Sequence, residues 1–257
     1  MSIALRSNDE IEAIARAGRV VWDTLNHLIE RCRPGVSALE LDHAARAMLK
    51  NLNAEASLGR VRNDAGDRFP GACCVNINDQ IAHSAPSSRT LREGDLVSLD
   101  LAASLGGWCA DACRTIAIGA IDPERARLMR AASACLERGL RACRAGRMWS
   151  HVAAEIRDEA AARDVRLIKG LGGHGVGRSL HERPLAWIDP EGADFTLAPG
   201  LMLTIEPAVT LGSGEITLDD DRWTLRTRDG RPAACEERTI AITPDGPRML
   251  TGPLTGP

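Results

Sequence analysis

Four carboxylates interrupt apolar, strand-like segments of this 257-residue chain. Asp100 lies within VSLDLAA, Asp111 follows eleven residues later, Glu206 lies within LTIEPAV, and Glu237 comes directly before RTIAI. A single acid in a strand usually faces solvent at a sheet edge. Four carboxylates gathered in a core without partners would each cost several kcal/mol, and a bound cation removes that cost. The pattern therefore predicts a cation site.

Two histidines stand in the glycine-rich stretch GGHGVGRSLHERP, which begins at Gly172. Four glycines make an ordinary helix unfavourable here, and a histidine in such a stretch is most often a plain polar loop residue. Four carboxylates and one imidazole, however, suit a pair of divalent ions about 3.5–4 Å apart, which activate water and polarise a carbonyl. We therefore expect His174 to be the nitrogen ligand, which leaves His181 free to contact substrate. An oxygen-rich site with one histidine favours Mn- or Fe-like ions over structural zinc.

Two pairs of helices are predicted around these residues. Capping boxes at Ser7 and Ser37 each begin a helix in the first half of the chain. In the second half, Asp122 and Pro123 form an N-cap and a first helical position, and Ser150 begins the next helix.

The two halves of the chain resemble each other. Each helix pair is joined by a CRxG string, and the glycines of the two strings, Gly35 and Gly146, lie 111 residues apart. Strand-like segments follow both pairs, and a glycine turn at 106–107 predicts an antiparallel hairpin that brings Asp100 and Asp111 to one face. The sequence thus predicts an internally duplicated α+β domain.

The overall composition limits the classes of partner. The net charge of −3 gives no electrostatic reason to expect nucleic acid or a membrane surface as a partner. We see no signal peptide, no apolar run of membrane-spanning length and no CxxC pair among the eight cysteines. We expect a reduced, cytoplasmic protein with one catalytic domain over residues 1–250 and a flexible tail over 251–257.

The five candidate ligands resemble those of a known family. In type and spacing, they match the metal ligands of the pita-bread metallopeptidases, and the chain is most similar to type I methionine aminopeptidases. The strings CVNINDQIAHSAP, GGHGVGRSLHERP, TIEPAV and RWTLRTRDGRPAACEERT occur in the family's order. The resemblance covers nearly the whole chain. It implies a pita-bread fold, in which a pseudo-twofold antiparallel sheet is covered by two helix pairs.

The resemblance also implies roles for the ligands. Asp111 and Glu237 would bridge two divalent ions, Asp100 would chelate one of them, and His174 and Glu206 would bind the other. Mn, Fe or Co are the expected metals, with Zn or Ni as alternatives. A hydroxide bridging the ions would attack the scissile carbonyl, and Glu206 would shuttle the proton.

Further roles follow for residues that bind no metal. The resemblance implies that His181 stabilises the oxyanion and that His83 hydrogen-bonds the substrate backbone. Phe69, Cys74 and Trp223 would form a pocket for methionine. The implied activity is the removal of the N-terminal methionine from nascent proteins and peptides, by a monomer that associates transiently with ribosomes.

Some positions depart from the family pattern and keep alternatives open. Ser84 stands where the family usually has glycine, Arg238 stands where it often has histidine, and the segment before Phe69 is longer and lacks tyrosines. These departures spare the metal ligands but question strict methionine specificity. One alternative is an Xaa-Pro aminopeptidase or prolidase, although the first capping box leaves no room for their usual N-terminal domain. The others are a specialised aminopeptidase and a non-catalytic binding protein of this fold, although the latter typically loses metal ligands.

Overall fold

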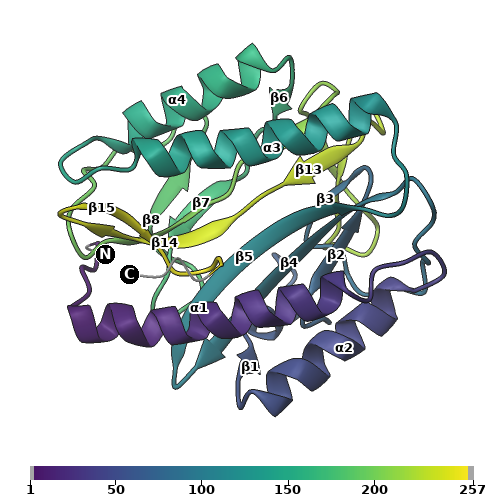
Figure 1. Cartoon of the computed structure of the whole chain (residues 1–257), viewed down its shortest axis with the longest axis horizontal. Coiled ribbons are helices and arrows are strands. Elements are labelled where there is room, and N and C mark those ends of the chain that lie inside the picture. Colours follow the sequence, from purple (N-terminus) through teal and green to yellow (C-terminus); the bar gives the residue numbers. More distant parts are fainter. Residues whose placement is uncertain (1–2, 254–257) are drawn as a thin grey trace.

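Four helices lie in two pairs on either side of the central strands (Figure 1). The computed structural model describes residues 3–253. Its helices are α1 (Asn8–Ile29), α2 (Ala38–Asn51), α3 (Pro123–Ala142) and α4 (Trp149–Ala162), with a short 3-10 helix at Leu58–Arg60. The predicted mixture of two helix pairs and antiparallel strands is confirmed.

The strands of the first half are β1 (Glu55–Ala56), β2 (Cys74–Ile77), β3 (Gln80–Ala82), β4 (Leu96–Leu105) and β5 (Trp108–Ala117). Those of the second half are β6 (Arg166–Leu167), β7 (Gly172–Gly175), β8 (Glu182–Trp187), β9 (Met202–Ile205), β10 (Ala208–Thr210), β11 (Ile216–Leu218), β12 (Leu225–Thr227), β13 (Ala233–Cys235), β14 (Arg238–Thr243) and β15 (Gly246–Met249). One sheet joins β1, β2 and β5 to β4, and another has the order β15-β14-β9-β7-β8.

The helices begin where local signals predict. Ser7 and Ser37 each form a complete capping box, and Asp122 caps α3 with its side chain. The start of α4 differs by one residue, because this helix begins at Trp149 and has no side-chain cap. Ser150 lies in its first turn instead.

The turn that joins each helix pair occurs twice in the structure. Gly35 and Gly146 both adopt a left-handed backbone, with φ of +92° and +85°. The amide of Gly35 donates to the carbonyl of Leu91 at 2.9 Å, and the amide of Gly146 donates to the carbonyl of Leu197 at 2.8 Å. The predicted internal duplication is therefore confirmed at this turn.

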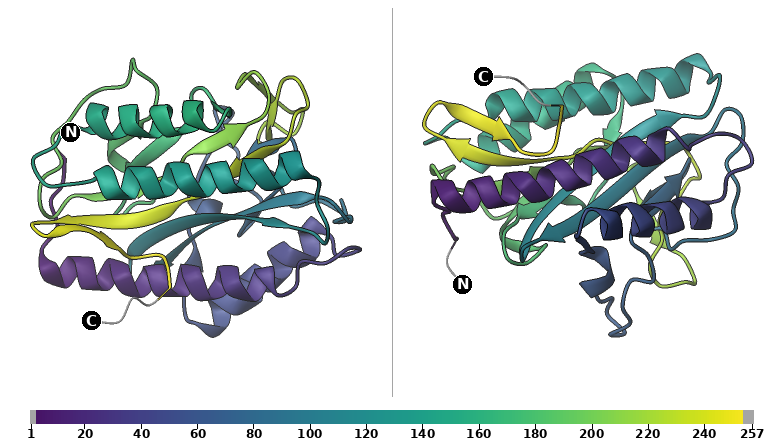
Figure 2. Two further views of the ribbon diagram at one scale, coloured as in Figure 1. Left: turned by 45° about the horizontal axis from the view of Figure 1, so that its top comes forward. Right: turned by 60° about the horizontal axis from the view of Figure 1, so that its bottom comes forward.

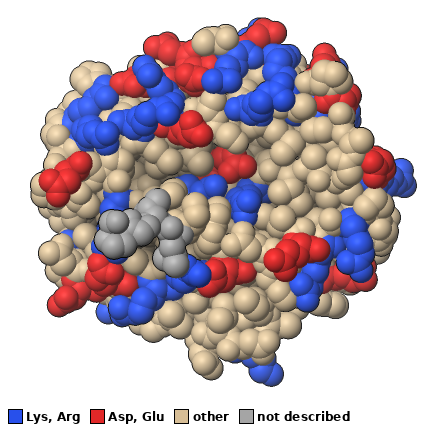
Figure 3. Space-filling model, in the orientation of Figure 1, with Lys and Arg blue, Asp and Glu red and all other residues tan. Residues whose placement is uncertain are grey.

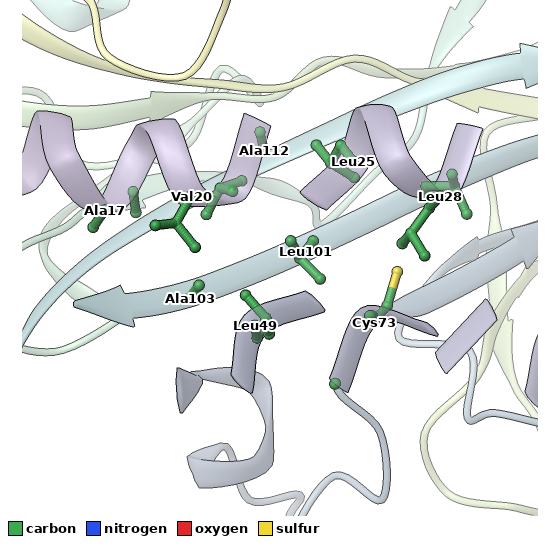
Figure 4. Close-up of a cluster of buried hydrophobic side chains, with 14 of the residues drawn as sticks. Ala17, Val20, Leu25, Leu28, Leu49, Cys73, Leu101, Ala103 and Ala112 are labelled. Atoms are coloured by element: carbon green, nitrogen blue, oxygen red, sulfur yellow. The ribbon is translucent and has the colours of Figure 1, made fainter. Parts of the chain in front are cut away.

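Each helix pair covers its own hydrophobic cluster. Figure 4 shows part of the first cluster, where Leu25 and Leu28 of α1 and Leu49 of α2 lie close to Leu101 on β4. The two further views in Figure 2 show the same arrangement, in which the helix pairs lie along the central strands. None of the helices within residues 3–253 has the length and apolar character that a membrane crossing needs.

The surface seen in Figure 3 carries basic and acidic side chains intermingled. On this face, therefore, the described residues form no continuous basic surface of the kind that binds nucleic acid.

The packed chain reaches beyond residue 250. Thr251 is fully buried, and its hydroxyl accepts a hydrogen bond of 2.8 Å from the amide of Thr239. The flexible tail was expected to begin at this residue, so its first position differs from the prediction. Residues 254–257 of that tail lie outside the described residues.

Candidate active site

A compact group of buried side chains lies where the two halves meet. Potential ligand atoms of Asp111, His174 and Glu237 lie within 4.8 Å of one another. Glu206 Oε1 lies 3.7 Å from His174 Nε2, and Asp100 lines the same cavity. The structure thus brings all five predicted ligands to one cavity, three of them in the tightest group.

The β4–β5 hairpin carries the two aspartates. The strands pair on both sides of the turn at 106–107, with Asp100 opposite Cys113 and Asp111 opposite Ala102. The aspartates are therefore diagonal neighbours on one face, as the hairpin prediction required.

Glycines allow His174 to reach this group from β7. This strand lies between β8 and β9 in its sheet. A Cβ atom on Gly173 would lie 2.2 Å from the carbonyl oxygen of Thr204, and one on Gly175 would lie 2.5 Å from that of Arg183. Side chains larger than hydrogen cannot fit there, which explains the unusual glycine content around His174.

Two buried threonines hold the candidate ligands in place. Thr204 Oγ1 donates to Glu206 Oε1 at 2.7 Å and accepts from the amide of His174 at 2.9 Å. Thr239 Oγ1 donates to the carbonyl of Asp111 at 2.8 Å and accepts from its amide at 3.0 Å. The sequence analysis missed both threonines. Each lies two residues from a candidate ligand, a spacing that places two strand side chains on one face.

Burial shapes the electrostatics of the group. It raises the pKa of Asp100 to about 7 and that of Glu206 to about 8, and it holds the pKa values of Asp111 and Glu237 well above their usual range. The negative charges of neighbouring carboxylates add to the last two shifts. Burial also lowers the pKa of His174 to about 3, so its imidazole is neutral and can bind a metal.

The residues present fit a cation. Among the described residues, Asp111 Oδ1 and Glu237 Oε1 are buried without any hydrogen-bond partner. Buried carboxylate oxygens in this state are costly unless a cation binds them. Together with a neutral imidazole, they form the donor set of a site for borderline or hard divalent ions.

The cavity continues from the carboxylates to an apolar wall. Its volume is about 380 Å³, and Phe69, Cys74 and Trp223 all line it. The rings of Phe69 and Trp223 meet edge to face, with centroids 5.2 Å apart. The three residues predicted for a substrate pocket thus lie together beside the candidate ligands.

Both remaining predicted histidines face the same cavity. His181 lies next to His174, with ring centroids 4.4 Å apart, and His83 lines the same cavity. His83 and His181 are both exposed to the open cavity, and partial desolvation by its wall lowers the pKa of each, while the charge of His181 adds to the shift at His83. The neutral imidazole is therefore favoured at each position.

Two cysteines form part of the cavity wall next to the ligands. The amide of Glu237 donates to the carbonyl of Cys113 at 2.9 Å, so β5 runs beside the segment that ends in Cys235. Thr115 Oγ1 donates to the carbonyl of Cys235 at 2.7 Å and accepts from its amide at 2.9 Å. The neighbouring Cys235 side chain, together with burial, raises the pKa of the Cys113 thiol. The sequence analysis gave neither cysteine a role at the site.

Arg238 takes a structural role at the position where the related family often has histidine. Its Nη1 donates to the carbonyls of Glu237 at 2.6 Å and Cys113 at 3.1 Å, and its guanidinium lies 4.7 Å from the Trp22 ring centroid. Arg238 therefore joins β14, on which it lies, to β5 and α1.

Comparison with known proteins places this geometry in a family. The model of the family described as "Metallopeptidase family M24" matches residues 12–244 of this chain. The chain belongs to this family. It is therefore a metallopeptidase, a hydrolase that uses divalent metal. The chain is 35% identical over 253 residues to a methionine aminopeptidase of Treponema pallidum, an alignment that covers 98% of this chain and 97% of the relative.

Solved structures agree with this membership. The crystal structure of methionine aminopeptidase from Rickettsia prowazekii matches with a TM-score of 0.91 at 26% identity and covers 98% of this chain and 100% of that one. The prolidase from Pyrococcus furiosus matches with a TM-score of 0.76 over 97% of this chain and 66% of that one. Its 20% identity shows only a shared fold. The predicted pita-bread fold is confirmed.

Proposed function

We propose that this chain is a methionine aminopeptidase that removes the N-terminal methionine from nascent proteins and peptides. The observation that carries the proposal is the joining of two features in one cavity. Partnerless carboxylate oxygens of Asp111 and Glu237 lie at one part of it, and an aromatic wall that suits a thioether side chain lies beside them.

We assign two divalent ions, with Mn, Fe or Co as the candidates, to the five carboxylate and imidazole side chains. Asp111 and Glu237 would bind both ions, Asp100 would bind one, and His174 and Glu206 would bind the other. Bound at these residues, divalent metal would supply a water of lowered pKa and polarisation of the scissile carbonyl.

The side chains of this chain supply proton transfer and orientation. Glu206 accepts a proton from the attacking water and delivers it to the leaving amine. Thr204 fixes the orientation of Glu206 for this acid–base role through their hydrogen bond. His181 stabilises the oxyanion by donating a hydrogen bond, and His83 holds the substrate backbone.

Phe69, Cys74 and Trp223 enclose the methionine side chain in this proposal. Aromatic edges attract the polarisable sulfur of a thioether, which favours methionine over leucine of similar size. The Phe69–Trp223 contact is an edge-to-face pair that would offer such an edge to the substrate.

The setting of the enzyme is part of the proposal. We assign a single catalytic domain, predicted over residues 1–250 and continued by the packed Thr251. We also assign a monomeric state, nascent N-termini as substrates and transient contact with ribosomes. We also propose a cytoplasmic location, and the eight free thiols of the chain support a reducing compartment.

The proposal is tested by hydrolysis of Met-Ala-Ser against Leu-Ala-Ser and Ala-Pro-Ala. Each peptide is incubated with metal-stripped protein and again after Mn(II), Co(II) or Fe(II) is restored. We expect metal-dependent release of methionine alone. Release from Leu-Ala-Ser would contradict methionine specificity, and release from Ala-Pro-Ala would favour the Xaa-Pro aminopeptidase alternative.

The role of His181 has its own test. His181→Ala should lower kcat by roughly 10²- to 10³-fold while the bound metal content is retained, because the lost hydrogen bond acts on the transition state. A variant that loses metal in proportion to its activity would contradict an oxyanion role.

A further inference from the structure

Four residues of the cavity wall form two pairs, and the approximate twofold symmetry between the halves relates the members of each pair. Two threonine hydroxyls, one in each half, bond reciprocally to the backbone of the opposite half. The offset of 124 residues between these threonines also relates Asp111 to Cys235, and Cys113 to Glu237. Each candidate bridging carboxylate therefore has a thiol as its symmetry equivalent, and all four side chains line the cavity.

The two thiols are close neighbours. Cys113 Sγ donates a hydrogen bond of 3.7 Å to the carbonyl oxygen of Cys235. Their backbones belong to adjacent segments, since the amide of Glu237 bonds to the carbonyl of Cys113. Cys113 is buried and Cys235 is half-buried, so Cys235 is the thiol that a small molecule in the cavity meets first.

A third thiol in the cavity is too far from Cys113 to compete for it. Cys74 on β2 and Cys113 on β5 lie opposite Asp100 from the two sides of β4. Two inter-strand spacings separate their Cα atoms by about 9.5 Å. A disulfide needs Cα atoms within about 7 Å.

We propose that Cys113 and Cys235 form an oxidisable dithiol in the wall of the active cavity, with peroxides as the reacting class. The sulfur of Cys235 attacks one peroxide oxygen, the O–O bond breaks, and a sulfenic acid and one water form from hydrogen peroxide. The sulfur of Cys113 then displaces the sulfenic oxygen as a second water, and the S–S bond forms. The two thiols lose two electrons and two protons, and the peroxide is reduced.

The disulfide would disturb the metal site, an effect that rests on the proposed function. An S–S bond is about 2.05 Å long, well inside van der Waals contact, so the two side chains must move toward each other to form it. Both cysteines lie two residues from a candidate bridging ligand, so this movement pulls on Asp111 and Glu237 together. We expect oxidation to lower kcat/KM by roughly 10- to 100-fold, the range for displaced supports of metal ligands, and dithiothreitol to restore it.

The experiment treats metal-loaded and metal-free protein with hydrogen peroxide and maps the thiols by mass spectrometry. Trypsin releases Cys113 in peptide 93–114 and Cys235 in peptide 229–238. We expect a disulfide between these peptides, formed in parallel with the loss of activity. Cys113→Ser and Cys235→Ser should abolish it, and each should resist oxidation relative to its own untreated activity.

Two controls isolate the dithiol. Cys32→Ser removes a half-buried thiol that packs beside α1, away from the cavity, and this variant should cross-link and lose activity like the unmodified protein. Phenylarsine oxide, which bridges two neighbouring thiols, should add once to the unmodified protein and block formation of the disulfide. This measurement needs no cavity variant to fold.

Two results would overturn the proposal. One is unmodified protein in which Cys113 and Cys235 stay unlinked under peroxide and fail to bind the arsenical. The other is linked protein with full activity, which would remove the effect on the metal site. Because the disulfide is detected by mass, a chain that forms it but never hydrolyses Met-Ala-Ser would refute the proposed function and leave the dithiol standing.

Discussion

The two halves of the molecule share a scaffold but differ in the groups they place on it. The helix-pair turn and the threonine bridge occur in both halves with nearly the same hydrogen bonds. An offset of 106 residues relates Leu91 to Leu197 at these turns, and the same offset relates Asp100 to Glu206. Asp111, by contrast, corresponds to a cysteine. The duplication therefore supplies positions, and individual side chains decide which positions can bind metal.

The strands that lie next to the candidate ligands differ in length between the two halves. In the first half, β4 and β5 have ten residues each and are joined by a tight glycine turn. In the second half, β9 and β14 have four and six residues. The chain between them forms β10–β13 and contributes Trp223 to the cavity. The first half thus has a long ligand-bearing hairpin, whereas the second half has shorter strands and an intervening segment that helps to line the pocket.

The sharpest contrast within the second half is between two adjacent glutamates. Glu237 lines the cavity, whereas Glu236 accepts from the amide of Thr115 at 3.1 Å and pairs with Arg238 at 3.3 Å. Successive side chains of an extended segment point to opposite faces. Glu237→Gln should therefore lower kcat/KM by roughly 10³-fold or more and reduce bound metal, and Glu236→Gln should keep most of both.

Peptide kinetics and metal analysis of the two variants check this contrast. Full metal content in Glu237→Gln would contradict its assignment as a ligand. Equal activity losses in both variants would show that the segment responds as a whole and that no single face carries the chemistry.

The pair of bridging threonines offers a comparison across the halves. Thr239 bonds to the backbone of Asp111, and Thr115 bonds in the same way to the backbone of Cys235. Valine keeps the shape of threonine and removes the hydroxyl. Each Thr→Val variant should lose about 1–3 kcal/mol of stability, because buried backbone groups lose partners. Thr239→Val alone should weaken metal binding by roughly 10- to 100-fold.

Thermal unfolding and metal titration of the two valine variants measure the two effects separately. A Thr115→Val variant with the same loss of metal affinity would mean that the bridge itself, and not its contact with a ligand-bearing residue, supports the site.

Much of the site could be predicted from the sequence because its signals are local or strongly spaced. The capping residues Ser7 and Ser37 lie next to the helices they begin, and the 106–107 turn fixes the hairpin of the aspartates. The family spacing then indicated that Glu206 and Glu237 would join them. The predicted ligands share one cavity, although their roles as ligands stay predictions.

The supporting residues could not be predicted because they depend on register between distant strands. Thr239 meets Asp111 across 128 residues, and Cys113 lies beside Cys235 across 122. Nothing near either residue in the sequence specifies its partner. Arg238 likewise gains its role only through the carbonyl of Cys113 and the ring of Trp22.

The equivalent carboxylates Asp100 and Glu206 predict a pH dependence of metal-free stability. Burial in the fold raises the pKa of Asp100 from its ordinary value of 3.8 to about 7 and that of Glu206 from 4.5 to about 8. Because the fold favours the protonated form of both carboxyl groups, their contribution to folding stability is complete below about pH 4. It is lost as pH rises to about 8. The loss is roughly 1.4 kcal/mol for each pKa unit.

Melting temperatures of chelator-treated protein at pH 5, 6.5 and 8 test this expectation. The temperature should fall with rising pH, and restored metal should remove most of the trend. Asp100→Asn and Glu206→Gln should each flatten the slope. If only one of them does so, the two halves do not share the electrostatic cost of the site.

The smallest expected effect tests the scaffold alone, through the two turns that join the helix pairs. Gly35 and Gly146 have left-handed backbones, and a Cβ atom on either would meet nothing within 4 Å. Replacement by alanine therefore costs only backbone strain, about 1–2 kcal/mol, and should lower each melting temperature by about 2–8 °C. Because both turns lie outside the cavity, kcat/KM should stay unchanged.

Gly18→Ala is the contrast to these two variants. Its Cβ atom would lie 2.2 Å from the carbonyl oxygen of Leu250, so this variant should lose more stability than either turn variant. Equal costs at the two turns would show that the duplicated scaffold is energetically as well as geometrically symmetric, whereas unequal costs would place part of the asymmetry in the scaffold itself.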